Sequence, residues 1–166
     1  MAAPMSSPPW WKGQRGEAYV AVQVLLFGLI LFGPSGKETL PPWPAYLAGP
    51  ARVGGLALLV VGIACSVAAA IGLGRNLTPL PHPRDDSSLV ETGLYAWVRH
   101  PIYGGLISAG FGWALFVQSW PALAWACLLS VFLDLKSRRE ESWLLARFPT
   151  YAAYRRRVRK LIPFIY

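Results

Sequence analysis

The sequence LVETGLYAWVRHPIYGG, residues 89–105, lies between two long segments without charged residues and decides how the rest of the chain can be arranged. It combines aromatic side chains, an Arg-His pair, a proline and two terminal glycines. Placing polar groups beside apolar helices costs free energy unless they form hydrogen bonds or ion pairs, so such groups are usually retained for a function. We therefore expect this stretch to carry chemistry, with hydrophobic helices before and after it.

The composition is that of a membrane protein. The chain has 166 residues, which suits a single domain, and 54% of them are hydrophobic while only 14% are charged. The net charge of +8 would also suit a nucleic-acid-binding protein, but no zinc-ligand spacing or recognition motif accompanies it. We therefore expect no nucleic-acid partner. Cys65 and Cys127 lie in separate apolar runs, so we expect no metal site either.

Two uncharged segments, residues 18–36 and 53–74, predict the first two membrane-spanning helices. Residues 37–50 between them contain four prolines, which favours an outer loop and not a continuing helix. The second segment is rich in small residues that permit close helix packing, among them Gly54, Gly55, Gly62 and Ser66.

The third uncharged segment is too long for one span. Residues 101–133 would form a helix of about 50 Å, whereas the hydrocarbon core of a bilayer is about 30 Å thick. The sequence Gln118-Ser119-Trp120-Pro121 predicts a turn that divides it into two helices of about 16 residues. We expect the second of these helices to continue beyond the bilayer to about Phe148.

The basic residues orient this arrangement. Fourteen of the sixteen fall on one side of a four-span topology, and only Lys37 and Arg52 fall on the other. The sequence thus predicts an all-α, multi-pass helical bundle with about four transmembrane helices, both termini in the cytoplasm and a cytoplasmic C-terminal helical extension. Residues 1–74 would form the first two spans and the outer loop, and residues 75–166 a polar loop, a helical hairpin and the C-terminal helices.

The C-terminal residues 151–160 place apolar side chains on one face of a helix and basic side chains on the other. This pattern is typical of a helix that lies on the cytoplasmic surface of a membrane. A helix that closes over the site as a lid is the alternative.

Several motifs in a fixed order carry a resemblance to a known family. LVETGLYAWVRHPIYGG is followed by the Glu140-Glu141 pair, by RF-x-x-Y-x-x-Y-x-x-R-V from Arg147 and by a terminal IPFI. This set resembles the isoprenylcysteine carboxyl methyltransferase family and its prokaryotic members over residues 76–165. The resemblance implies a multi-pass enzyme, in a bacterial inner membrane, that uses S-adenosylmethionine to methylate a lipophilic small-molecule or prenylated acceptor among membrane lipids.

The resemblance also implies which residues form the site. Arg99 and Lys136 are the candidates for orienting the acceptor. Lys136 stands where the family has an arginine, so a planar guanidinium that can donate two parallel hydrogen bonds is replaced by a compact ammonium. The implied cofactor-binding residues are Ser87, Ser88, Leu89, Val90, Tyr95, His100, Pro101, Ile102, Tyr103 and Glu140.

The residues themselves are compatible with that cofactor but leave the acceptor open. S-adenosylmethionine carries a sulfonium, an ammonium and a carboxylate, which carboxylates, aromatic rings and cations can meet. A carboxylate acceptor needs only a cation to orient it, whereas a thiol or a phospholipid amine needs a base such as His100 or Glu141. A membrane reductase, which would need more spans, and a non-catalytic assembly subunit are the other hypotheses.

Overall fold

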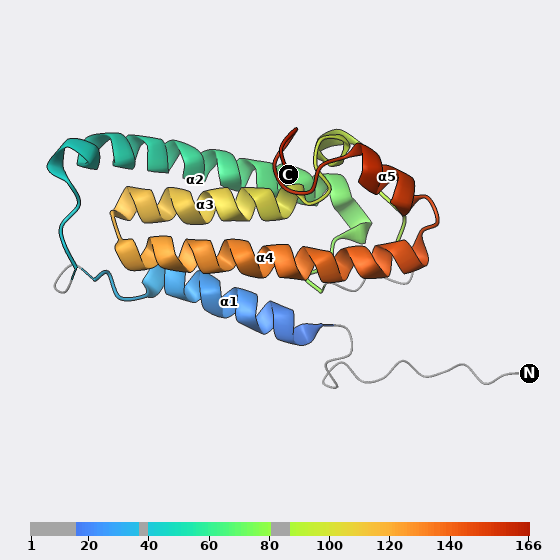
Figure 1. Cartoon of the computed structure of the whole chain (residues 1–166), viewed down its shortest axis with the longest axis horizontal. Helices are drawn as coiled ribbons and strands as arrows, with labels where there is room; N and C mark the ends of the chain where they lie inside the picture. The colour runs from blue at the N-terminus through green and yellow to red at the C-terminus, as the bar shows by residue number, and fades with distance from the viewer. Residues whose placement is uncertain (1–15, 37–39, 81–86) are drawn as a thin grey trace, which may run out of the picture.

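The computed structural model describes residues 16–36, 40–80 and 87–166, and in them the chain forms four long helices side by side with a short fifth helix at one end (Figure 1). Two short 3-10 helices, η2 and η3, precede α3. The only β-structure within these ranges is an isolated bridge between Val98 and Arg159. The all-α prediction is therefore confirmed. The helices are α1 (Glu17–Phe32), α2 (Ala45–Leu73), η2 (Gly74–Asn76), η3 (Gly93–Ala96), α3 (Pro101–Val117), α4 (Trp120–Arg147) and α5 (Tyr151–Arg157).

The predicted turn in the third apolar segment is confirmed. α3 ends at Val117, and Gln118 takes the left-handed conformation with φ of 54°. Ser119 then caps α4, because its Oγ accepts a hydrogen bond of 3.3 Å from the backbone N–H of Ala122. α4 continues for 28 residues to Arg147, as expected, so its last turns, about four from Asp134 onward, extend beyond its apolar part.

The predicted outer loop is wrong for residues 45–50, because α2 already begins at Ala45 and contains Pro50. A proline interrupts a helix by removing one N–H donor and crowding the carbonyl four residues earlier. Here that carbonyl belongs to Tyr46, which is exposed near the start of the helix, so solvent can satisfy it. The charge count also included Lys12, Arg15, Lys37 and Arg84, and these lie outside the described residues.

A seam of glycines holds α2 against α3. Gly55 and Gly62 on α2 face Gly112 and Gly105 on the antiparallel α3, with a spacing of seven residues on both helices. A Cβ atom on Gly55 would lie 2.6 Å from the backbone nitrogen of Phe116, and one on Gly62 would lie 2.6 Å from the carbonyl oxygen of Gly105. The two backbones therefore touch directly, as the small residues predicted.

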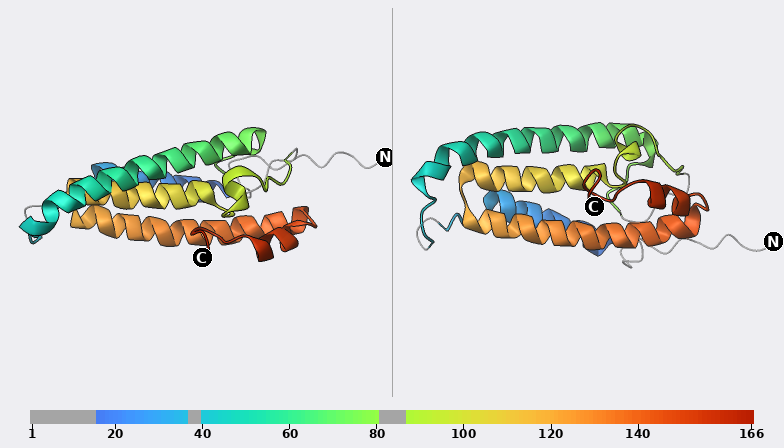
Figure 2. Two further views of the ribbon diagram at one scale, coloured as in Figure 1. Left: turned by 90° about the horizontal axis from the view of Figure 1, so that it is seen from above. Right: turned by 45° about the horizontal axis from the view of Figure 1, so that its top comes forward.

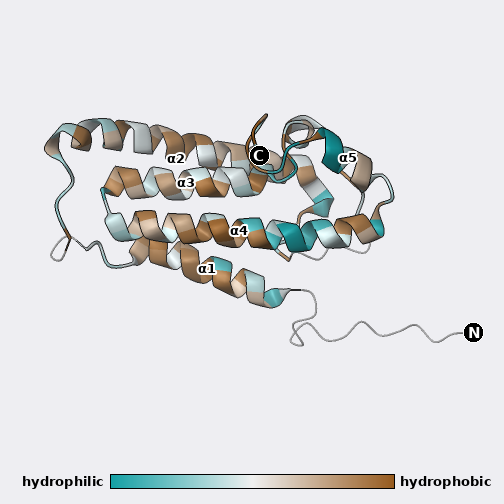
Figure 3. Cartoon of the chain, in the orientation of Figure 1, coloured by the Kyte–Doolittle hydropathy of each residue, from teal (hydrophilic) through white to brown (hydrophobic). Residues whose placement is uncertain are grey.

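α4 packs against both α1 and α3 and completes the bundle (Figure 2). The buried core joins Leu26 and Ile30 of α1, Tyr103 of α3, and Leu129 and Leu133 of α4. Figure 3 shows that most of the bundle is apolar and that polar residues gather over the second half of α4 and on α5. We call this region, formed by residues 134–147, α5 and residues 87–100, the polar end.

Among the described residues, one helical stretch is by itself long and apolar enough to cross a membrane, Ala45–Asn76. α1 and α3 are apolar but shorter, with 16 and 17 residues. At 1.5 Å per residue they measure about 24 to 26 Å. The four-span count therefore stays a prediction.

The C-terminal helix differs from the expected membrane-surface helix. α5 has only seven residues, and its Tyr151 and Tyr154 are buried together with Val158. They pack against Leu144 and Phe148, so the apolar face of this segment is covered by protein and not by lipid. The helix ends at Arg157 because Val158 turns into an extended segment that pairs with the chain before α3.

The glycine seam makes a sharp prediction with a neighbouring control. Gly55→Ala should lower stability by about 1 to 3 kcal/mol, because the new methyl group overpacks a backbone contact. Gly54→Ala should be neutral or stabilising by up to about 1 kcal/mol, since a Cβ at Gly54 meets nothing within 4 Å. Thermal unfolding of both variants in detergent checks this, and equal melting temperatures would contradict the direct backbone contact.

Candidate active site

A cavity of about 370 Å3 opens at the polar end, within the size range of small-molecule sites. It is lined by residues of all five α-helices, of the segment between α2 and α3 and of the turn between α4 and α5. Every residue that the sequence singled out for the site lines it except Pro101 and the candidate base Glu141. Those residues are Ser87, Ser88, Leu89, Val90, Tyr95, Arg99, His100, Ile102, Tyr103, Lys136 and Glu140.

His100 is placed by the start of α3. It is the residue that caps this helix, and Pro101 occupies the first helical position, where a missing N–H costs nothing. The carbonyl oxygen of His100 accepts the N–H of Gly104 at 3.1 Å. Pro101 therefore restricts the backbone next to His100 and so orients the His100 side chain, although Pro101 itself does not line the cavity.

A short backbone pairing forms one wall of the site. The N–H of Arg99 donates to the carbonyl oxygen of Arg159 at 2.8 Å, and the N–H of His100 donates to that of Lys160 at 3.0 Å. The segment after α5 is thereby held beside the segment before α3, so the two most polar parts of the sequence meet.

Glu140 joins His100 and Tyr103 on the cavity side of α4. The Tyr103 hydroxyl donates to Glu140 Oε1, and His100 Nδ1 lies 3.5 Å from Glu140 Oε2. The rings of His100 and Tyr103 are parallel, with centroids 5.5 Å apart. Burial by itself would lower the pKa of His100, but its contacts with Glu140 and Glu141 outweigh burial and raise that pKa above 6.5.

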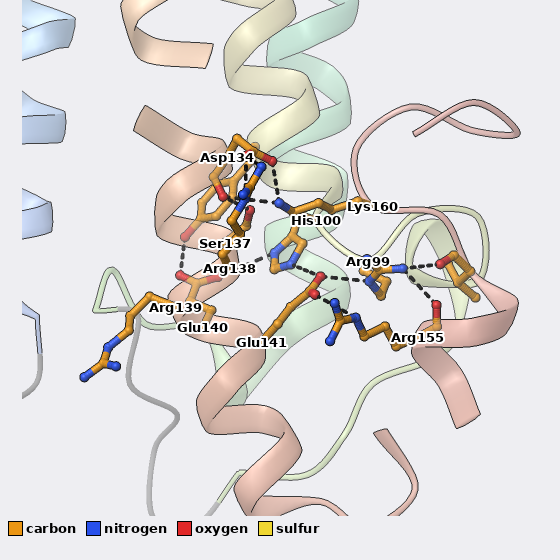
Figure 4. A network of polar contacts seen from close by, with 12 residues as sticks. Arg99, His100, Asp134, Ser137, Arg138, Arg139, Glu140, Glu141, Arg155 and Lys160 are labelled. Carbon is orange, nitrogen blue, oxygen red and sulfur yellow. Dashed lines mark hydrogen bonds and ion pairs between the residues drawn. The ribbon is translucent and has the colours of Figure 1, made fainter. Parts of the chain in front are cut away.

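Glu141 lies within ion-pairing distance of two arginines and of His100 (Figure 4). Its carboxylate lies 2.9 Å from Arg99 Nε, 3.2 Å from His100 Nε2 and 3.2 Å from Arg155 Nε. Burial would raise the pKa of Glu141, but His100 and Arg99 lower it to about 2. Arg99 also donates to the carbonyl oxygens of Arg155 and Val158. The guanidinium of Arg99 is thus engaged in holding the polar end together.

Lys136 is the cation inside the cavity. Its side chain is buried, and its ammonium donates to Gln23 Oε1 at 2.8 Å and to the carbonyl oxygen of Pro79 at 3.0 Å. It also lies 5.3 Å from the centre of the Tyr103 ring. The bond to Gln23 ties α1 to α4, so α1 contributes to the site as well as to the bundle.

The sequence did not identify the part of the lining that comes from tertiary packing. Asn76 joins the beginning of the segment between α2 and α3 to its later part, because its Oδ1 accepts the N–H of Ser88 at 3.0 Å. The Tyr154 hydroxyl donates to the carbonyl oxygen of Tyr95 at 2.6 Å. For α5, the two tyrosines of the C-terminal motif, Tyr151 and Tyr154, were the feature of the sequence that could have indicated its contact with the cavity. The further lining residues are Gln23, Leu73, Asn76, Leu77, Thr78, Pro79, Leu80, Leu106, Leu144, Phe148, Tyr151 and Tyr154.

One buried polar atom of the lining lacks a partner. The Tyr151 hydroxyl makes no hydrogen bond within the part of the chain that the structure describes, and its residue is 1% exposed. A buried hydroxyl without a hydrogen bond costs about 1 to 3 kcal/mol.

The Glu141 cluster predicts how stability depends on pH. A carboxylate whose pKa is lowered by folding stabilises the protein above its unfolded pKa, and this contribution is lost as the pH falls toward the folded pKa. For Glu141 the window runs from about 4.5 down to about 2. The melting temperature should therefore fall across this window, and Glu141→Gln should flatten the fall.

Glu91→Gln is the control for this prediction. Glu91 is paired with Arg157 at 2.6 Å on the surface, and its side chain is 31% exposed. Exposed pairs contribute little. A fall in melting temperature that Glu91→Gln flattens as strongly as Glu141→Gln would contradict the role of the buried cluster.

Comparisons with known proteins agree with this arrangement. The family model described as phospholipid methyltransferase matches residues 50–150. Protein-S-isoprenylcysteine O-methyltransferase of Homo sapiens is 32% identical over 118 residues, which cover 68% of this chain and 41% of the relative. The same enzyme of Saccharomyces cerevisiae is 29% identical over 119 residues, which cover 67% of this chain and 48% of the relative. The chain thus spans less than half the length of the curated relatives it matches.

A solved structure shares the fold. The eukaryotic intramembrane Ras methyltransferase, an isoprenylcysteine carboxyl methyltransferase, superposes with a TM-score of 0.61 at 22% identity. The match covers 97% of this chain and 70% of that chain, so helices outside the matched sequence family also correspond. The resemblance drawn from the motifs is confirmed, and the chain belongs to the phospholipid methyltransferase family.

Proposed function

We propose that this chain is an integral membrane methyltransferase that transfers the methyl group of S-adenosylmethionine to a lipophilic acceptor. The observation that carries the proposal is the cavity at the polar end, where the carboxylate of Glu140 and the ammonium of Lys136 both face a space lined by aromatic rings. Membership of the phospholipid methyltransferase family supports the reaction class.

The cavity fits the cofactor in chemistry. S-adenosylmethionine supplies an electrophilic methyl group on a sulfonium. Glu140 can meet its ammonium or its ribose hydroxyls, and the tyrosine rings can lie against the adenine or the sulfonium. The unpartnered Tyr151 hydroxyl offers one more hydrogen bond to a polar ligand. The residues that were predicted to bind the cofactor keep that role here, with Pro101 as a positioning residue.

The chain's own residues contribute mainly alignment. Methyl transfer is an in-line displacement, so the protein must hold the acceptor, the methyl carbon and the sulfur in one line and exclude water. The apolar lining excludes water, and Leu106 and Ile102 of α3 supply part of it. Lys136, buried beside Tyr103, is suited to orient a negatively charged acceptor by its charge.

A carboxylate is the acceptor that the site supports best. Because it is already ionised, it needs no base. A thiol or an amine would need one, and the contacts of His100 with Glu140 and Glu141 raise its pKa, which makes this side chain a weaker candidate for a neutral base at a given pH. Glu141 is itself held by Arg99 and Arg155. The relatives are isoprenylcysteine O-methyltransferases, and we propose the carboxylate of an isoprenylcysteine-like group as the acceptor class.

We further propose that all four long helices are embedded in a membrane, with the polar end on the cytoplasmic side. The apolar surface of α2 supports this, because many of its large side chains, such as Val53, Val60 and Ile71, are exposed. The excess of basic residues at the polar end gives the orientation. By the same rule we propose that both termini are in the cytoplasm, and we propose the inner membrane of a bacterial cell as the membrane.

Cofactor binding is the first test. The wild-type protein in detergent should bind S-adenosylmethionine in calorimetry, and Glu140→Gln and His100→Ala should each weaken binding by about tenfold or more, which is about 1.4 kcal/mol. Folded wild-type protein that gives no heat with this ligand would remove the methyltransferase proposal.

Two tyrosines provide a matched control for this titration. Tyr151→Phe should weaken binding severalfold without lowering the melting temperature, because its hydroxyl has no partner among the described residues. Tyr154→Phe should lower the melting temperature, because its hydroxyl bonds to Tyr95 at 2.6 Å. The opposite pattern would contradict the assignment of Tyr151 to the ligand.

The role of Lys136 makes a separate prediction. Lys136→Met should lower kcat/KM for a prenylcysteine acceptor by about tenfold or more while leaving the affinity for S-adenosylmethionine within about threefold, since the charge acts on the acceptor. Lys136→Arg should retain most of the activity. Turnover that stays unchanged in Lys136→Met would favour an uncharged acceptor.

A further inference from the structure

A second cavity of about 370 Å3 lies on the outer side of the polar end. Six cationic side chains and a single acidic side chain line it, and of these residues only Arg99 also lines the candidate active site. We call it the basic cavity. Its cations come from four parts of the chain and are Arg99, Arg138, Arg155, Arg156, Arg159 and Lys160.

The acidic groups nearby do not balance these cations. Glu141, the carboxylate of the lining, is shared among Arg99, His100 and Arg155. Asp134 is shared between Arg138 and Lys160, as Figure 4 shows.

Two cations of the lining remain without a partner. The side chains of Arg156 and Arg159 make no hydrogen bond or ion pair with any residue that the structure describes, and both are exposed. Two free guanidinium groups beside four other cations repel one another, so an anion from outside would stabilise this arrangement.

The level of the basic cavity along the bundle indicates where that anion comes from. α4 changes from apolar to polar at Asp134, and Arg138 follows one helical turn later, about 6 Å further along the axis. The headgroup layer outside the hydrocarbon core is about 5 to 8 Å thick on each side. With the membrane placement proposed above, the basic cavity therefore lies at the level of the lipid phosphates.

The lining also has an apolar side. Ile165 and Tyr166 contribute to it, and the neighbouring Phe164 is 77% exposed. A free phosphate ion has no apolar part that could pack against these side chains. A lipid has one, because its glycerol and acyl chains can bury apolar surface there. Guanidinium groups bind phosphate oxygens in a planar, two-point geometry.

We propose that the basic cavity binds the phosphate group of an anionic membrane lipid, at a site separate from the cavity that we assign to methyl transfer. The proposal goes beyond the methyltransferase function and uses only the placement of the chain in a membrane. A lipid bound there would bridge α4, α5 and the segment that follows α5.

The test is a titration of the full chain, purified in detergent, with three probes. These are dioctanoyl phosphatidylglycerol, dioctanoyl phosphatidylcholine and glycerol phosphate, each measured by calorimetry at physiological salt. The anionic lipid should bind at least about tenfold more tightly than either of the others, because only it combines net negative charge with acyl chains. Equal affinity for glycerol phosphate would overturn the assignment to a lipid, and equal affinity for phosphatidylcholine would overturn the requirement for net charge.

Two double variants locate the binding. Combining Arg156→Gln with Arg159→Gln should weaken phosphatidylglycerol binding about 30-fold, as expected for two cations that each act near a membrane surface. Combining Arg139→Gln with Arg157→Gln removes the same charge from the polar end but outside the lining, and it should change binding less than about threefold.

Equal weakening in both double variants, with unchanged melting temperatures, would show diffuse attraction and overturn the site. The affinity for S-adenosylmethionine provides an independent readout, because Arg156 and Arg159 do not line the other cavity. It should be the same in the wild type and in both double variants. Failure of the methyltransferase proposal would therefore leave this result intact, and failure of the lipid site would leave cofactor binding intact.

Discussion

The carboxylate of Glu141 is the group on which the polar end depends. It is 4% exposed, and an isolated carboxylate in such a place would cost several kcal/mol. The cost is offset only while Arg99, His100 and Arg155 stay within hydrogen-bonding distance. These side chains belong to the segment before α3 and to α5, so one buried carboxylate fixes the position of both segments against α4. The cavity lies between the elements that this cluster holds.

The glycine seam provides the second constraint, and it acts through α3. Because α2 and α3 touch backbone to backbone, the axis of α3 cannot shift without a clash. Ser66 of α2 extends the seam to the first turn of α3, where its Oγ donates to the carbonyl oxygen of Ile102 at 3.1 Å. His100 and Tyr103 are at the same turn, so the packing of two apolar helices determines where the polar residues of the site point.

The sequence predicted most of the helices and about half of the residues that line the cavity, and its errors have physical causes. The turn at Gln118 followed from the length of an uncharged run, and the residues that we propose to bind the cofactor followed from ordered motifs. Gln23 and Asn76 could not be identified, because only packing of distant segments brings them to the cavity. An apolar stripe such as that of α5 indicates that this face of the helix is buried. The sequence does not distinguish burial against protein from burial against lipid, because both produce the same apolar pattern.

The backbone pairing between Arg99 and Arg159 also bears on the order in which the molecule is made. It joins residues 60 positions apart, with α3, α4 and α5 between them. Closing so long a loop is unfavourable until the intervening helices are in place. During synthesis the apolar helices can insert and pack through their glycines well before Arg159 leaves the ribosome. The helices that carry the glycine seam can therefore pack first, and the cavity is complete only when residues 151–160 have joined them.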